Sequence, residues 1–258
     1  MTANPTRAPE RSADPIQRPG TPERLWQHWG GLRKLPAQSL DGVTSAVVLA
    51  AHPDDEILGF GGSIAVLAER GARLRIVIAT DGEASHPMST AISRERLAEL
   101  RRTEDANSLA VLGAADAEVV RLGLPDGGLN LDDGTLTARI RELVSGFELC
   151  VAPWTGDVHP DHEAVGRAAL AAREGSGDGT VWQYPVWMWH WAAPGDARVP
   201  WHRAVRVEIP AWAWVEKQEA VACHRSQILP LSPAPEDAAV LSESDLEHFR
   251  RRGEVVLR

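Results

Sequence analysis

Cysteine is scarce in this sequence, since Cys150 and Cys223 are the only two among 258 residues. Two thiols cannot build a disulfide framework, and each lies in an apolar or helical context that suits a buried free thiol, so we expect a reducing, cytoplasmic location. The first 20 residues lack the apolar core of a signal peptide, and no run of about 18 apolar residues is present to span a bilayer. Secretion and membrane insertion are therefore not expected.

Positive charge is also in deficit, because 27 Lys and Arg face 36 Asp and Glu, for a net charge of -9. Such a chain offers no broad basic surface, so nucleic acid is not an expected partner. Hydrophobic residues make up 43% of the sequence, which is typical of a packed globular protein. We expect residues 1–40 to form a tail followed by a short helix in the stretch 22–35, and this helix should end at the Gly30–Gly31 pair. Residues 41–258 are expected to form a single domain.

Apolar runs alternate with helical patterns from residue 45 onward. The runs predict buried strands at 45–51, 74–80, 117–124 and 147–153, with helices at 57–71, 93–113 and 136–146 between them. This order predicts an α/β fold, a Rossmann-like open parallel sheet with helices on both faces. Residues 180–258 are expected to add strands and a helix, 214–227, at the C-terminal side.

Two segments of similar composition follow the first and the fourth predicted strand. "HPDDE" (52–56) places three acids side by side, and "HPDH" (159–162) places two histidines three residues apart. Adjacent carboxylates repel one another unless a cation offsets them. His52 and Asp55, with one histidine of the second segment, would form a two-histidine, one-carboxylate set with an open position, which is typical of catalytic zinc and also suits iron(II).

The motifs "AHPDDEILGFGG", "ATDGE", "LPDGG" and "HPDH", in this order and spacing, resemble the PIG-L or LmbE-like family of zinc-dependent deacetylases. The resemblance covers about residues 45–170, with "CHRSQ" (223–227) similar to a later family element. It implies an LmbE-like fold and Zn²⁺ as cofactor. It also implies three metal ligands, His52, Asp55 and His162.

The resemblance further implies roles for the residues beside these ligands. Asp54 would be the general base, and a protonated His159 would stabilise the oxyanion and protonate the leaving amine. Asp161 would orient His159. The family's Arg-x-Glu element is matched by Arg102 and Glu104, and Arg102 would bind substrate.

The expected function is that of a hydrolase acting on linear amide bonds, a zinc-dependent enzyme that removes the N-acetyl group from an N-acetylglucosamine-type sugar or its conjugate. The alternatives are an amidase that cleaves a larger acyl group or a thiol conjugate, and a non-catalytic sugar-binding relative. The expected partner is therefore a small amino-sugar or glycoconjugate, and the oligomeric state is open.

Tryptophan is the abundant aromatic, with ten residues of which eight follow residue 150. Within 180–191 the aromatic residues alternate, which predicts a strand with one face over the core. The alternative is that some of these rings form a carbohydrate platform over the active site.

Overall fold

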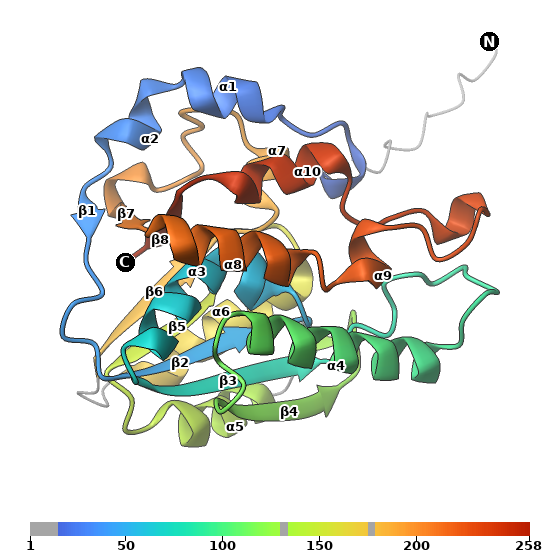
Figure 1. Cartoon of the computed structure of the whole chain (residues 1–258), viewed down its shortest axis with the longest axis horizontal. Helices are drawn as coiled ribbons and strands as arrows, with labels where there is room; N and C mark the ends of the chain where they lie inside the picture. The colour runs from blue at the N-terminus through green and yellow to red at the C-terminus, as the bar shows by residue number, and fades with distance from the viewer. Residues whose placement is uncertain (1–14, 130–133, 175–178) are drawn as a thin grey trace, which may run out of the picture.

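The computed structural model describes residues 15–129, 134–174 and 179–258, and within them the strands form one eight-stranded sheet (Figure 1). The strand order is β1-β7-β8-β6-β5-β2-β3-β4, in which β8 runs antiparallel to β6 and β7 while the other pairs are parallel. The mobile tail predicted for the first 20 residues lies largely outside the described residues. The strand bounds are β1 Ala37–Gln38, β2 Ser45–Ala50, β3 Arg73–Thr80, β4 Glu118–Leu124, β5 Leu149–Pro153, β6 Thr180–Tyr184, β7 Ala204–Glu208 and β8 Gly253–Leu257.

The four predicted strands are confirmed as β2, β3, β4 and β5, and the predicted α/β fold class is confirmed with them. Longer helices connect and cover the strands, as expected for parallel crossovers. Their bounds are α3 Asp55–Glu69, α4 Arg94–Val111, α5 Thr135–Val144, α6 Pro160–Arg173 and α8 Ala211–Val221. The shorter segments are α1 Glu23–His28, α2 Gly30–Lys34, α7 Met188–Trp191, α9 Arg225–Ile228 and α10 Glu243–Glu247, with 3-10 turns η1 Pro15–Gln17, η3 Trp201–Arg203, η4 Pro235–Asp237 and η5 His248–Arg250.

Strand β2 is buried on both faces, which explains its continuous apolar sequence. Ala46 and Val48 belong to a core that α3 and α8 share on one face of the sheet. Val47 and Leu49 belong to a second core that α5 and α6 share on the other face. Because side chains alternate along a strand, successive residues of β2 pack against the helices on opposite faces of the sheet.

The glycines that follow the acids in α3 allow close packing. A Cβ on Gly59 would lie 2.1 Å from the Tyr184 ring, and one on Gly62 would lie 2.5 Å from the Ile209 side chain. The Tyr184 hydroxyl in turn donates to the Leu49 carbonyl over 2.7 Å. These glycines therefore allow α3 to pack closely on the rest of the molecule.

The helix expected at 22–35 ends beside the Gly30–Gly31 pair, as predicted, because α1 stops at His28, and a further short helix, α2, begins at Gly30. Two other local predictions are wrong. The strand predicted for 180–191 ends at Tyr184, since Pro185 has no N–H to donate, and α7 follows. The helix at 214–227 breaks after Val221.

The N-terminal helix α1 packs on the body of the molecule. Trp26 is fully buried, and its indole N–H donates to the Trp189 carbonyl over 3.0 Å. Glu23 is buried beside His248 and Arg251, and its oxygen lies 2.7 Å from His248 Nδ1. None of the described helices combines the length and the apolar character that a membrane crossing needs.

The order of strands places a topological switch point between β2 and β5. From β2 the chain proceeds to β3 on one side, and it reaches β5, on the other side, only after β4. In open α/β sheets, ligands bind at the carboxyl ends of the strands at such a point. The segments after β2 and β5, which hold "HPDDE" and "HPDH", therefore meet there.

Candidate metal centre

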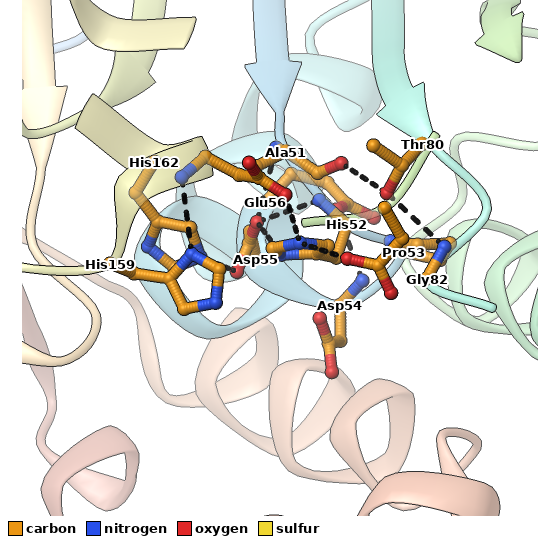
Figure 2. Close-up of polar contacts among 12 residues, drawn as sticks. Ala51, His52, Pro53, Asp54, Asp55, Glu56, Thr80, Gly82, His159 and His162 are labelled. Atoms are coloured by element: carbon orange, nitrogen blue, oxygen red, sulfur yellow. Dashed lines mark hydrogen bonds and ion pairs between the residues drawn. The ribbon is translucent and has the colours of Figure 1, made fainter. Parts of the chain in front are cut away.

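Asp55 occupies the first turn of α3 and faces two imidazoles. Its Oδ2 accepts the backbone N–H groups of Ala51 and His52 over 3.1 and 2.9 Å, which fixes the carboxylate against the turn. Asp55 Oδ1 lies 3.2 Å from His162 Nε2, and Oδ2 lies 3.5 Å from His52 Nδ1. Figure 2 shows Asp55 between these two histidines. The structure therefore brings the three predicted metal ligands together, from both sides of the switch point.

His162 is oriented by a carboxylate that the sequence analysis does not single out. Its Nδ1 lies 2.7 Å from Asp157 Oδ2, so Nε2 is the nitrogen left for the site. Asp157 also accepts the backbone N–H groups of Val186, Trp187 and Met188 over 2.8 to 3.0 Å. The signal in the sequence is weak, a single acid in the loop after β5, five residues before His162.

The far nitrogen of His52 faces two further carboxylates. His52 Nε2 lies 3.1 Å from Asp126 Oδ1 and 3.4 Å from Asp161 Oδ2. Asp161 also accepts the backbone N–H groups of Gly127 and Leu129 over 2.7 and 3.1 Å. Its carboxylate thus contacts His52 and the loop after β4, which differs from the predicted contact with the His159 ring. The reason is that Asp161 follows the first residue of α6, where its backbone N–H, rather than its side chain, points back to His159.

His159 lies beside both candidate histidine ligands, with ring centroids 4.9 Å from His52 and 4.6 Å from His162 (Figure 2). Its Nδ1 accepts the backbone N–H of Asp161 over 3.3 Å, so a neutral ring carries its proton on Nε2. Burial, and then the charges of His162 and His52, lower the pKa of His159 to about 3. With Nδ1 occupied by that backbone N–H, the ring offers its Nε2–H as a donor.

Asp54 is buried at the pocket floor in a strained backbone conformation. Its φ is 131°, a region that side chains other than glycine rarely adopt. Its Oδ2 lies 3.3 Å from Arg101 Nη2. Burial raises the pKa of Asp54 to about 7, against the opposing charge of Arg101. A carboxylate with a pKa near neutrality is suited to accept and return a proton.

The arginine of the pocket is Arg101, and its neighbour Arg102 has another contact. Arg101 donates to the carbonyls of Pro53 and Gly82 over 2.8 and 2.9 Å and lines the pocket. Arg102 instead pairs with Asp81 over 2.6 Å. One residue along a helix turns a side chain by about 100°, so Arg102 projects from a different face of α4.

The segments around the site hold one another in place. Glu83 of the "ATDGE" segment accepts the backbone N–H of Asp126 over 3.0 Å and so supports the loop after β4. Glu104 accepts the N–H and hydroxyl of Ser226 over 2.8 and 2.6 Å, and this contact begins α9 and ties the "CHRSQ" segment to α4. His224 of that segment is buried, and neither of its ring nitrogens has a hydrogen-bond partner among the described residues.

The residues present fit a divalent metal ion. Ring nitrogens of His52, His159 and His162 all lie within 4.8 Å of one another, and the Asp55 carboxylate lies against two of these rings. Imidazoles and a buried carboxylate are ligands of the type that zinc and iron(II) take. These side chains open into a pocket of about 640 Å³, a size that accommodates a small-molecule substrate.

The PIG-L family profile, described as GlcNAc-PI de-N-acetylase, matches residues 47–173. The 1D-myo-inositol 2-acetamido-2-deoxy-alpha-D-glucopyranoside deacetylase 1 of Catenulispora acidiphila is 27% identical over 187 residues, which cover 60% of this chain and 58% of that protein. The probable N-acetyl-alpha-D-glucosaminyl L-malate deacetylase 2 of Bacillus subtilis is 33% identical over 132 residues, 49% of this chain and 59% of that protein. The chain therefore spans less than two thirds of these relatives.

Among solved structures, the conserved protein TT1542 from Thermus thermophilus has a similar fold. The two chains align with a TM-score of 0.58 and 25% sequence identity, over 84% of this chain and 94% of that one. The likeness extends well beyond residues 47–173 and so includes much of the C-terminal region.

Proposed function

Residues 47–173 form a PIG-L family domain, and from this premise we propose that the chain is a metal-dependent hydrolase that removes the N-acetyl group from an N-acetylglucosamine-type amino sugar or its conjugate. The observation that carries the proposal is the Asp55 carboxylate held between His52 and His162, with Asp54 and His159 beside it. Deacetylases acting on such sugars are named among the relatives.

The proposed metal is zinc, held by His52, Asp55 and His162. When bound, such an ion polarises the amide carbonyl and makes a water molecule acidic enough to attack it near neutral pH. Asp157 supports this set by fixing the tautomer of His162, and Asp161 and Asp126 do the same for His52.

Asp54 is the proposed general base. Its carboxylate accepts the proton of the attacking water and returns it to the amide nitrogen, since an amine leaves poorly without a proton. Its pKa of about 7 suits both transfers. Arg101, 3.3 Å from the carboxylate, keeps it directed into the pocket.

His159 is the proposed oxyanion donor. Because its Nδ1 accepts a backbone N–H, its Nε2–H is free to donate to the oxygen on which negative charge develops. His159 is therefore still proposed as a catalytic residue, but Asp54, rather than His159, is proposed to protonate the leaving amine.

The substrate is proposed to be a small amino sugar bound in the same pocket. Asp126 and Arg101 supply polar groups near the reacting end, and we assign substrate contact to Arg101 in preference to Arg102, because only the former lines the pocket. The free thiols of Cys150 and Cys223 support a cytoplasmic location. We take residues 41–258 as one domain whose tryptophan-rich part reaches over the site through Trp187.

The test is reconstitution of the purified chain with zinc or iron(II), followed by measurement of acetate and free amine from N-acetylglucosamine and its glycosides. Stoichiometric metal and equal release of the two products are expected. Release of a longer acid from N-acyl homologues, with no acetate, would identify an amidase for larger acyl groups. Protein that binds no metal and cleaves no sugar amide would contradict the proposal and favour a binding protein.

A further inference from the structure

The lining of the pocket is of mixed composition. It holds the candidate metal ligands and Asp54. Beside them it presents apolar side chains, which we call the apolar wall. The apolar wall consists of Ile16, Leu58, Met88, Val186, Trp187, Ala238, Ala239, Val240 and Leu241. A pocket of about 640 Å³ with such a surface has room for more than a sugar ring and an acetyl group.

The apolar wall is assembled from separate segments that are tied to one another. His86 joins the loop after β3 to the loop before α10, with its Nε2 3.2 Å from the Ala238 carbonyl. His190 joins η1 to α10, since its ring nitrogens lie 2.8 Å from the Arg18 carbonyl and 2.7 Å from Asp245 Oδ1. Asp157 fixes Trp187 through its backbone N–H. The wall is therefore formed in advance of any ligand.

Met88 stands at the mouth of the pocket with 74% of its surface exposed. A large apolar side chain held in water beside an apolar wall is unfavourable unless a ligand covers it. The flexible thioether can adapt to ligands of different shape. Met88 thus extends the apolar wall toward the entrance.

The charges of the lining disfavour an anionic substituent. Among the described lining residues Arg101 is the only lysine or arginine, and it is engaged by Asp54 and two backbone carbonyls. The lining carboxylates include Glu236 at the rim, for which the described residues offer no ion-pair partner, and Asp245 beside the wall. A phosphate or carboxylate placed there would lose water without gaining a cation.

From this composition we propose that the substrate carries an uncharged, apolar alkyl or aryl substituent that packs on the apolar wall while its amide lies at the metal ligands. The proposal rests on the proposed function, because it names the substrate class of that same pocket. The substituent has two possible sources, the group attached to the sugar or the N-acyl chain itself.

Two series of N-acylated glucosamines test the proposal with the metal-loaded protein. The first compares methyl and octyl N-acetylglucosaminides with N-acetylglucosamine 1-phosphate, and the second compares N-acetyl with N-octanoylglucosamine. In one series the octyl or octanoyl member should have a kcat/KM about tenfold higher or more, mainly through a lower KM, as expected for burial of several methylene groups. The 1-phosphate should react more slowly than the methyl glycoside. The series that responds identifies the source.

A charge placed on the apolar wall provides the matched variant. Val240→Lys adds a cation at a half-buried lining position, whereas Val215→Lys makes the same change on the exposed face of α8, away from the pocket. We expect Val240→Lys to lower the octyl advantage about tenfold and to improve use of the 1-phosphate. Val215→Lys should leave both values unchanged, and thermal unfolding should show that each variant is folded.

Binding separates failure of this proposal from failure of the proposed function. Octyl glucoside and glucose 1-phosphate, which have no amide, are titrated into the protein by calorimetry. If no sugar amide is cleaved but octyl glucoside binds and Val240→Lys weakens it, the proposed function fails and the apolar wall stands. Equal kcat/KM of the short and long members in both series, or a preference for the phosphate in turnover and in binding, would overturn the apolar-substituent proposal even in an active deacetylase.

Discussion

Asp157 contacts His162 over 2.7 Å and, through the same carboxylate, holds the backbone of Trp187. One acid thereby sets both the direction of a candidate metal ligand and the position of the apolar wall. We therefore expect metal binding and substrate binding to be coupled through this residue.

Replacement of Asp157 by Asn should weaken zinc affinity about 10- to 100-fold, the usual cost of losing an outer partner of a ligating histidine. The affinity is measured by competition with a chelator of known strength. Asp116→Asn, at an exposed position, is the control and should bind zinc as the unaltered chain does. Unchanged affinity in Asp157→Asn would show that His162 needs no such support.

Substitutions of Asp54 and His162 should have different effects, one on proton transfer and the other on metal binding. Asp54→Asn keeps the side-chain shape and should lower kcat about 10²- to 10⁴-fold while the bound metal persists. His162→Ala should lose the metal itself on gel filtration, because it removes an Nε2 that faces Asp55. Metal content by atomic emission, measured beside kcat, makes the distinction. An Asp54→Asn enzyme with near-normal turnover would remove Asp54 from the proposed mechanism.

Backbone strain at Asp54 should affect the free energy of unfolding of variants at this position. Its φ of 131° is easily adopted by glycine but not by alanine, and both substitutions remove the carboxylate. Asp54→Gly should therefore unfold with a free energy about 1 kcal/mol or more above that of Asp54→Ala in urea. The opposite order would indicate that the chain relaxes at this turn once the carboxylate is gone.

His224 should make the fold sensitive to acid. Burial lowers the pKa of His224 from 6.5 to about 3, so the unfolded chain takes up the proton first. Above about pH 6.5 the His224 ring is neutral in both the folded and the unfolded state, so it does not destabilise the fold. As the pH falls from there toward 3, the free energy of unfolding decreases by about 1.4 kcal/mol per pH unit.

His224→Phe should remove this component and raise the melting temperature at pH 5, since it also replaces a buried polar ring that has no described partner. His202→Phe, at an exposed position, should not change the pH dependence. If the melting temperature changes with pH to the same extent in His224→Phe and in the unaltered chain, His224 is not the source of the acid sensitivity.

The sequence was informative where one local rule decides the structure. Continuous apolar runs located β2 to β5, and the repeated His-Pro-Asp pattern pointed to His52, Asp55 and one histidine of the second segment, which the family resemblance identified as His162. Those residues follow strand ends, and parallel topology alone then brings them together.

Contacts between residues far apart in the chain could not be predicted from the sequence. Asp161 contacts His52 rather than the His159 ring because the loop after β4 lies against it, and no spacing within the chain encodes that neighbour. Likewise Arg101 and Arg102 differ by one step around α4, and only the position of that helix on the sheet decides which one reaches the pocket. The strand expected through Trp187 ends at Tyr184, directly before Pro185. The proline was a visible signal in the sequence, but the aromatic alternation was given more weight.

The pairing of β2 with β5 has a consequence for the order of events in the cell. His52 and Asp161 are 109 positions apart, so both segments must leave the ribosome before the two halves of the proposed centre can approach. A nascent chain that has formed only β2 and β3 offers His52 but not His162, the second proposed ligand histidine. We therefore expect metal loading to follow the pairing of β2 with β5, so that the ion binds a sheet that is already assembled rather than acting as the template around which the polypeptide organises.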